Sequence, residues 1–127
     1  LANNETGAIQ PIVEIASLAK ERGALIHCDA VQAPGRIPFD VNTLGIDLLS
    51  ISAHKFGGPK GVGALFISNN LRLKPLVIGG GQERGLRPGT ENVLGIAGFG
   101  IAADLVGQDL QNMEKYLKKI SFNFNSN

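Results

Sequence analysis

The chain has 127 residues, 12 basic against 11 acidic side chains and 43% hydrophobic residues, a composition that fits at most one small, nearly neutral domain. The net charge of +1 argues against a nucleic-acid or membrane-surface partner that is bound by clustered cations. No apolar run predicts a transmembrane helix, which needs about 18 residues. The single cysteine, Cys28, excludes an internal disulfide and a two-cysteine metal site, and it favours a reducing compartment.

The first third of the chain predicts a helix followed by a strand. Apolar residues at helical spacing predict a helix from Pro11 to Arg22, with Pro11 in its first position. Gly23 is placed to adopt the left-handed conformation just past the helix end. The apolar run 24–28 then predicts a buried parallel strand that stops at Asp29.

Further apolar runs in the middle of the chain predict more strands. Residues 46–52 and 62–67 have strand character, and a short fourth strand is expected at Leu76–Ile78, before the glycines 79–81. Strands that follow a helix in this way indicate an α/β layer architecture.

The pattern becomes helical again from Val93, and a separate helix is expected over Asp109–Lys119. The asparagine-rich residues 122–127 have no period and are expected to be disordered. Because the chain starts without methionine and contains 17 glycines, we expect a segment of a larger protein. It divides into residues 1–107, which carry the motifs, and residues 108–127, a helix with an atypical tail.

Two predicted strands end in residues that carry chemistry. Asp29, with Gln32 three residues later, follows one strand, and Ser52-Ala53-His54-Lys55 follows the next. Ligands of open α/β sheets bind beyond the carboxyl ends of strands. A lysine that forms a Schiff base and a carboxylate that keeps the pyridine nitrogen protonated are what pyridoxal phosphate requires.

Four motifs in order resemble those of cysteine desulfurases, which belong to the class V aminotransferase-like branch of the fold type I pyridoxal-phosphate enzymes. The resemblance extends from residue 1 to about residue 107. The motifs are Asn3-Asn4-Glu5-Thr6-Gly7, His27-Cys28-Asp29-Ala30-Val31-Gln32, Ser52-Ala53-His54-Lys55, and Gly79-Gly80-Gly81-Gln82-Glu83-Arg84-Gly85 with Arg87-Pro88-Gly89-Thr90-Glu91-Asn92.

The resemblance implies an α/β fold, in which this chain is the central part of the large, mostly parallel-sheet domain. It implies that Lys55 is the catalytic Schiff-base lysine and that Asp29 pairs with the pyridinium nitrogen. It also places Gln32 and Asn4 on the 3-oxygen side of the ring or beside the substrate.

For the cofactor phosphate, the resemblance implies binding by Ser52 and His54. Thr90 resembles the threonine that reaches the phosphate of a neighbouring subunit, which implies a homodimer. Arg84 and Arg87 are expected to brace their loop or a subunit contact.

The activity implied is that of a transferase that converts L-cysteine to L-alanine and passes sulfur through an enzyme persulfide. Iron–sulfur cluster or thiolation pathways would receive the sulfur through acceptor or scaffold proteins. Cys28 does not fit the family's sulfur-accepting cysteine, because it lies inside a predicted buried strand. This chain alone is therefore expected to be inactive. A cytoplasmic location is expected, and a mitochondrial one is left open.

Several alternatives remain open at this point. Selenocysteine lyase has similar motifs around residues 87–92, and a truncated, non-catalytic remnant is a rival of another kind. Without the resemblance, Lys55 fits a surface lysine and Asp29 a turn cap. A metal site is not expected, because the two histidines, Cys28 and Asp29 lack ligand spacing. Gly57–Gly61 lacks the ending of a phosphate-binding loop.

Overall fold

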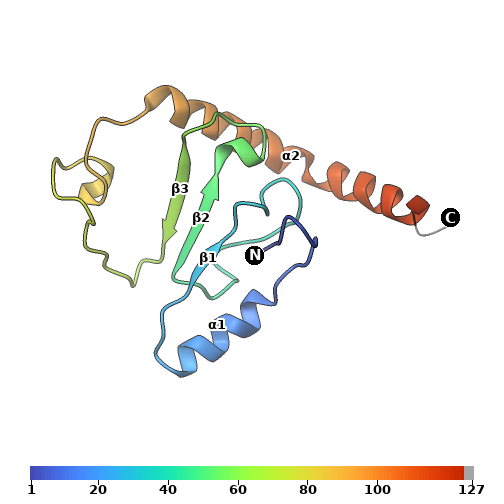
Figure 1. Cartoon of the computed structure of the whole chain (residues 1–127), viewed down its shortest axis with the longest axis horizontal. Coiled ribbons are helices and arrows are strands. Elements are labelled where there is room, and N and C mark those ends of the chain that lie inside the picture. Colours follow the sequence, from blue (N-terminus) through green and yellow to red (C-terminus); the bar gives the residue numbers. More distant parts are fainter. Residues whose placement is uncertain (125–127) are drawn as a thin grey trace.

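The computed structural model describes the backbone of residues 1–124, with side chains up to residue 110 and at 112, 113, 115, 116 and 119. A short three-stranded sheet lies in the middle, with one helix at its lower end and a long helix that crosses its top and extends outward (Figure 1). The elements in chain order are α1 (Ile12–Glu21), β1 (His27–Asp29), β2 (Leu48–Ser52), the 3-10 helix η1 (Ala53–Lys55), β3 (Gly63–Ile67), the 3-10 helix η2 (Glu83–Gly85) and α2 (Val93–Phe124).

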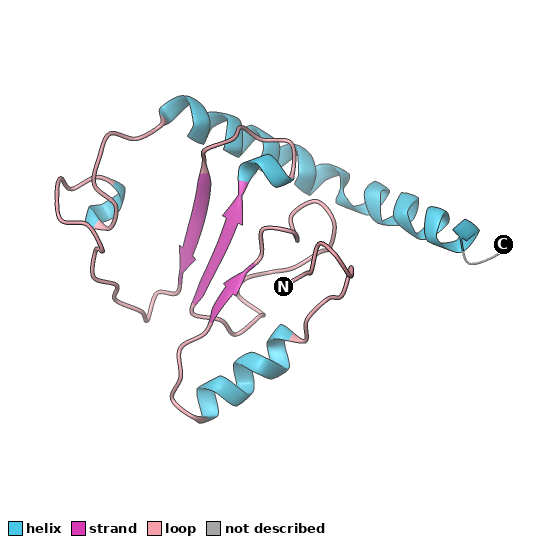
Figure 2. Cartoon of the chain, viewed as in Figure 1, coloured by secondary structure: helices cyan, strands magenta, loops and turns pink. Residues whose placement is uncertain are grey.

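The sheet is mixed, in the order β1-β2-β3 (Figure 2). β1 and β2 are parallel, in a register that pairs Asp29 with Ser50, whereas β2 and β3 are antiparallel and pair Ser52 with Gly63. The connection between β2 and β3 is too short for the crossover of a dozen or more residues that a parallel pair needs. The expected α/β architecture is present, and the expected parallel pairing applies to β1 and β2.

Helix α1 agrees with the sequence prediction to within one residue. Pro11 occupies the cap position and Ile12 begins the helix. Gly23 adopts the left-handed conformation, with φ of 67°, as expected. Ala16 is the buried residue of α1, and it packs in one cluster with Cys28 and Leu49 of the sheet.

The hydrophobic core is small for a chain of this length. Leu49 is the one large side chain that is fully buried among the described residues, and most other core positions are alanines. The accessible surface is 9256 Å². A compact monomer of 13.4 kDa is expected to expose about 6,500 Å². The fold therefore leaves much apolar surface uncovered, including one face of the sheet, where Leu65 is 49% exposed.

The predicted strand at Leu76–Ile78 was wrong. Leu76 and Val77 form a bend without a strand partner, and Leu76 and Ile78 are 98% and 94% exposed. An apolar run of three residues carries no periodicity, so the sequence pattern alone could not separate an exposed loop from a strand.

The two predicted C-terminal helices form one helix, α2. It begins after Asn92, whose Oδ1 accepts a hydrogen bond from the Gly95 N–H at 3.1 Å, a typical N-cap contact. Gly107 does not adopt a left-handed conformation, so it does not end the helix, and α2 continues through Phe124. Helical structure thus covers part of the tail that was expected to be disordered; residues 125–127 lie outside the described residues.

The prediction that no stretch could cross a membrane was also wrong by length and composition. The 18 residues Val93–Leu110 of α2 form a helical stretch that is long enough and apolar enough to cross a membrane. The stretch contains Asp104 and Asp109, and α2 contacts η1 in this fold.

Small residues let α2 approach the turn after β2 closely. Pro59 sits over Gly98, where an added Cβ would lie 2.6 Å from Pro59 Cγ. One helical turn later, Ala102 is buried against Gly58, and the rings of Phe56 and Phe99 lie 5.6 Å apart. This close approach fixes the turn that follows β2.

A pair of Leu→Ala variants tests the core. Leu49→Ala removes the one large, fully buried side chain and is expected to lower the free energy of unfolding by about 2–5 kcal/mol. Leu76→Ala, at a side chain that is 98% exposed, is expected to change it by less than about 0.5 kcal/mol. Urea unfolding followed by circular dichroism measures both, and equal effects would contradict this core.

Two glycines of α2 test its contact with the turn. Gly100→Ala meets open space and is expected to stabilise the chain by about 0.5–1 kcal/mol, because alanine favours a helix. Gly98→Ala has the same helix preference but meets the rigid Pro59 ring, so a net destabilisation is expected, from an overpacking cost of about 1–3 kcal/mol. Thermal unfolding separates the two variants, and stabilisation by both would show that the contact is absent.

Candidate active site

The carboxyl ends of β1 and β2 lie at the same edge of the sheet because the two strands are parallel. Asp29 is the last residue of β1, and Ser52 is the last residue of β2. The Ala30 N–H donates to the Ser50 carbonyl at 2.9 Å and continues the pairing past the end of β1. The chemistry-bearing residues of both strands therefore meet at one edge, where open α/β sheets bind ligands.

The lysine lies in a tight turn directly after β2. Ala53, fully buried, starts η1, and its carbonyl accepts hydrogen bonds from the N–H groups of Phe56 at 3.1 Å and Gly58 at 2.9 Å. A side chain at Gly58 would lie 2.8 Å from Ala53 Cβ, so only glycine closes the turn without displacement. Lys55, half-buried, extends from this turn.

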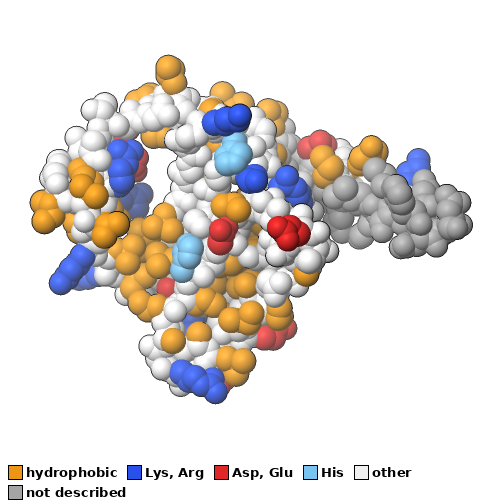
Figure 3. Space-filling model, in the orientation of Figure 1, with side chains coloured by type: hydrophobic (Ala, Val, Ile, Leu, Met, Phe, Trp, Pro, Cys, Tyr) orange, Lys and Arg blue, Asp and Glu red, His pale blue; other side chains and the backbone are white. Residues whose placement is uncertain are grey.

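Ser52 and His54 form a hydrogen-bonded pair, with 2.9 Å between Ser52 Oγ and His54 Nδ1. If the hydroxyl donates, the ring carries its proton on Nε2; if the ring donates, the hydroxyl proton is free. In either arrangement one N–H or O–H donor remains for a ligand. Figure 3 shows both histidines of the chain on one face, with acidic and basic side chains around them.

Asp29 is exposed, and one of its carboxylate oxygens is already used. Asp29 Oδ1 accepts a hydrogen bond from the Val31 N–H at 2.9 Å, which fixes the carboxylate just beyond the strand. Oδ2 has no hydrogen bond within the part of the chain that the structure describes, so it is available to a ligand. Gln32, half-buried, lies in the turn that follows.

The remaining predicted site residues lie on loops. The loop that carries Asn4 starts beside the end of β1, where the Leu1 amine donates a hydrogen bond to the Asp29 carbonyl at 2.6 Å. Asn4 is exposed in the turn after the chain start, and the side chain of its neighbour Asn3 holds this turn together. Asn3 Oδ1 accepts from the N–H groups of Glu5 and Thr6, both at 2.9 Å. This role of Asn3 was not predicted from the sequence, although asparagine side chains commonly accept hydrogen bonds from the backbone two residues later.

Thr90 is exposed in the loop between β3 and α2. This loop projects beyond β3, on the side of the sheet away from β1 (Figure 1). Within one chain, the fold therefore brings together the strand-end residues and leaves Thr90 apart from them.

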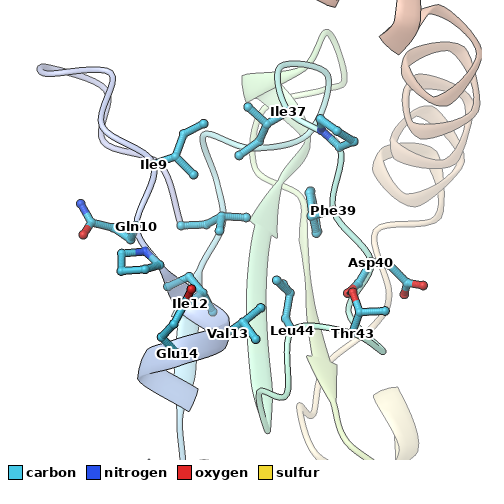
Figure 4. Close-up of a pocket in the computed structure, with 13 residues that line it drawn as sticks. Ile9, Gln10, Ile12, Val13, Glu14, Ile37, Phe39, Asp40, Thr43 and Leu44 are labelled. Atoms are coloured by element: carbon cyan, nitrogen blue, oxygen red, sulfur yellow. The ribbon is translucent and has the colours of Figure 1, made fainter. Parts of the chain in front are cut away.

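An apolar hollow lies elsewhere in the described part of the chain. It has a volume of about 300 Å³ between the start of α1 and the loop before β2 (Figure 4). Its lining is mainly aliphatic and aromatic, with Ile9, Ile12, Val13, Ile37, Phe39 and Leu44. It has no cluster of donors for an anion, so we place the chemistry at the strand ends. Among the described residues, no group of three or more His, Cys, Asp or Glu could hold a metal ion.

The two residues before Asp29 differ in exposure. His27 is exposed, although it lies in the apolar run that predicted a buried strand. Cys28 is 4% exposed, as that prediction implies.

Comparison with known proteins agrees with this arrangement. Residues 1–126 match the aminotransferase class-V family. A cysteine desulfurase from Nostoc sp. is 55% identical over 118 residues, which are 93% of this chain and 29% of that protein. The cysteine desulfurase IscS of Clostridium botulinum is 53% identical over 120 residues, 94% of this chain and 30% of that protein.

A solved NifS-like protein superposes with a TM-score of 0.91 at 45% identity, covering 98% of this chain and 35% of the other. The chain thus spans about three-tenths of the length of the curated relatives it matches. Taken together, the strand-end residues, the fold and these similarities show that the chain belongs to the aminotransferase class-V family and is related to its cysteine desulfurases.

Proposed function

We propose that this chain provides the lysine-bearing part of the pyridoxal-phosphate site of a cysteine desulfurase. The observation that carries the proposal is the parallel pairing of β1 with β2, which puts Asp29 and the Ser52–Lys55 segment at one sheet edge. In the complete enzyme, L-cysteine would be converted to L-alanine and its sulfur passed to an acceptor protein. The names of the relatives support cysteine over selenocysteine as substrate.

The residues at this edge fit the cofactor in their chemistry. When bound, pyridoxal phosphate supplies an aldehyde that an amine can capture and a pyridine ring that accepts electrons. Lys55 offers the amine, and the free Oδ2 of Asp29 offers an acceptor for the protonated ring nitrogen. Gln32 follows Asp29 closely enough to donate or accept at the same edge.

For the phosphate, the Ser52–His54 pair offers a donor in both of its hydrogen-bonded arrangements. Neutral hydroxyl and imidazole donors bind an anion without the burial of a second full charge. Asn4 and Thr90 lie on exposed loops. We propose that Asn4 reaches the site of its own chain and that Thr90 reaches the site of the neighbouring subunit in a homodimer.

Two lysine variants test the proposal. The purified chain with added pyridoxal phosphate is expected to show an absorbance band near about 390–420 nm that borohydride fixes, because the amine binds the aldehyde covalently. Lys55→Ala is expected to lose this band. Lys60→Ala, which removes an exposed lysine from the next turn, is expected to keep it.

An equal band in Lys55→Ala and the unchanged chain would contradict the assignment of Lys55. A chain that shows no band, although folded by circular dichroism, would instead support the reading that these residues hold no cofactor by themselves.

A further inference from the structure

The loop between β3 and α2 is closed upon itself by side chains. Within this loop, Gly79 and Pro88 approach each other closely, since a Cβ at Gly79 would lie 2.7 Å from the Pro88 ring. Gln82 Oε1 accepts a hydrogen bond from the Gly89 N–H at 3.2 Å and joins the two sides of the segment 83–88. Figure 2 shows the resulting ring of chain around η2.

Arg87 also stabilises this turn, through hydrogen bonds to its backbone carbonyls. Its Nη1 donates to the carbonyls of Pro88 at 3.1 Å and Gly89 at 3.0 Å, directly before Thr90. Its Nη2 lies 3.9 Å from Glu83 Oε1. Because both side chains are about half exposed, this ion pair contributes little, so the bonds to the backbone carbonyls carry the contact.

The loop holds a backbone conformation that its sequence does not favour. Glu83 and Arg84 both have positive φ, at 47° and 60°, which is unfavourable for residues other than glycine. Such conformations persist where surrounding contacts over-determine them. The side-chain bonds of Gln82 and Arg87 supply those contacts, whereas the Arg84 side chain makes no hydrogen bond within the described residues.

We propose that Arg87 and Gln82 are positioning residues that hold Gly89 and Thr90 in one conformation. Thr90 is then already ordered when a phosphate group binds to it. Ordering the turn before binding removes an entropic cost from the binding step. This inference rests on the proposed function, since Thr90 is assigned to the cofactor phosphate there. Neither side chain touches the phosphate; both act through the turn.

Amide hydrogen exchange of the labelled chain tests the positioning without any cofactor. Arg87→Gln and Gln82→Leu are each expected to speed exchange at Gly89 about five- to tenfold, the loss of a hydrogen-bonded turn. Gln82→Glu keeps an acceptor oxygen and is expected to restore slow exchange. Arg84→Gln, the matched control three positions away, is expected to match the unchanged chain.

Arg87→Lys separates geometry from charge. Lysine keeps the charge, but its Nζ is one bond closer to Cα than the Arg87 Nη1 that donates to both carbonyls, so it does not reach them in the same geometry and is expected to behave like Arg87→Gln. If Arg87→Lys and Arg87→Gln both exchange as slowly as the unchanged chain, the positioning role is overturned.

A titration with pyridoxal phosphate, followed at the Thr90 amide signal, links the turn to binding. In the dimeric chain, where Thr90 would reach the phosphate of the neighbouring subunit, the apparent affinity is expected to fall about tenfold in Arg87→Gln and to stay unchanged in Arg84→Gln. Equal affinity in dimeric Arg87→Gln would overturn the proposal. Absence of the Lys55 absorbance band in the unchanged chain would count against the proposed function alone, and the exchange rates at Gly89 would still decide the positioning role.

Discussion

The parallel pairing of β1 with β2 is the contact on which the site depends. β1 has only three residues, and its start is held by Asp47, whose Oδ2 accepts from the Ile26 N–H at 2.9 Å. A shift of the register by one residue would reverse the faces of β1, bury Asp29 and expose Cys28. The relative positions of Asp29 and Lys55, which we propose as partners of the pyridine ring and the aldehyde, are thus set by backbone hydrogen bonds rather than by contacts between the two side chains.

The sequence predicted where β1 and β2 end, because strand ends depend on local signals. An apolar run that stops at Asp29, and another that stops before Ser52-Ala53-His54-Lys55, required no long-range information. Long-range information was needed to predict the direction of β3 and to predict that Leu76–Ile78 form a loop and not a strand. Three apolar residues look the same in a strand and in an exposed loop, and only the absence of a pairing partner in the described fold separates the two.

The contacts that support the site were harder to predict, because several of them depend on glycines, which have no Cβ atom, and on single side-chain hydrogen bonds. Gly98 and Gly58 matter since no Cβ separates α2 from the lysine turn. Asn3 and Gln82 hold turns through side-chain bonds to backbone N–H groups, which composition does not reveal. The large exposed surface was equally hard to predict. The sheet and its helices bury mainly alanines, so most large apolar side chains stay exposed.

Nuclear Overhauser contacts in the labelled chain test the central claim most directly, because they measure the pairing itself. The account predicts backbone contacts between Cys28 and Leu49 and between Asp29 and Ser50, in the parallel register, together with proximity of the Ser52 and His54 side chains. A register moved by one residue, or β2 paired with β3 while β1 makes no contact with β2, would contradict the account, since Asp29 and Lys55 would then no longer share an edge.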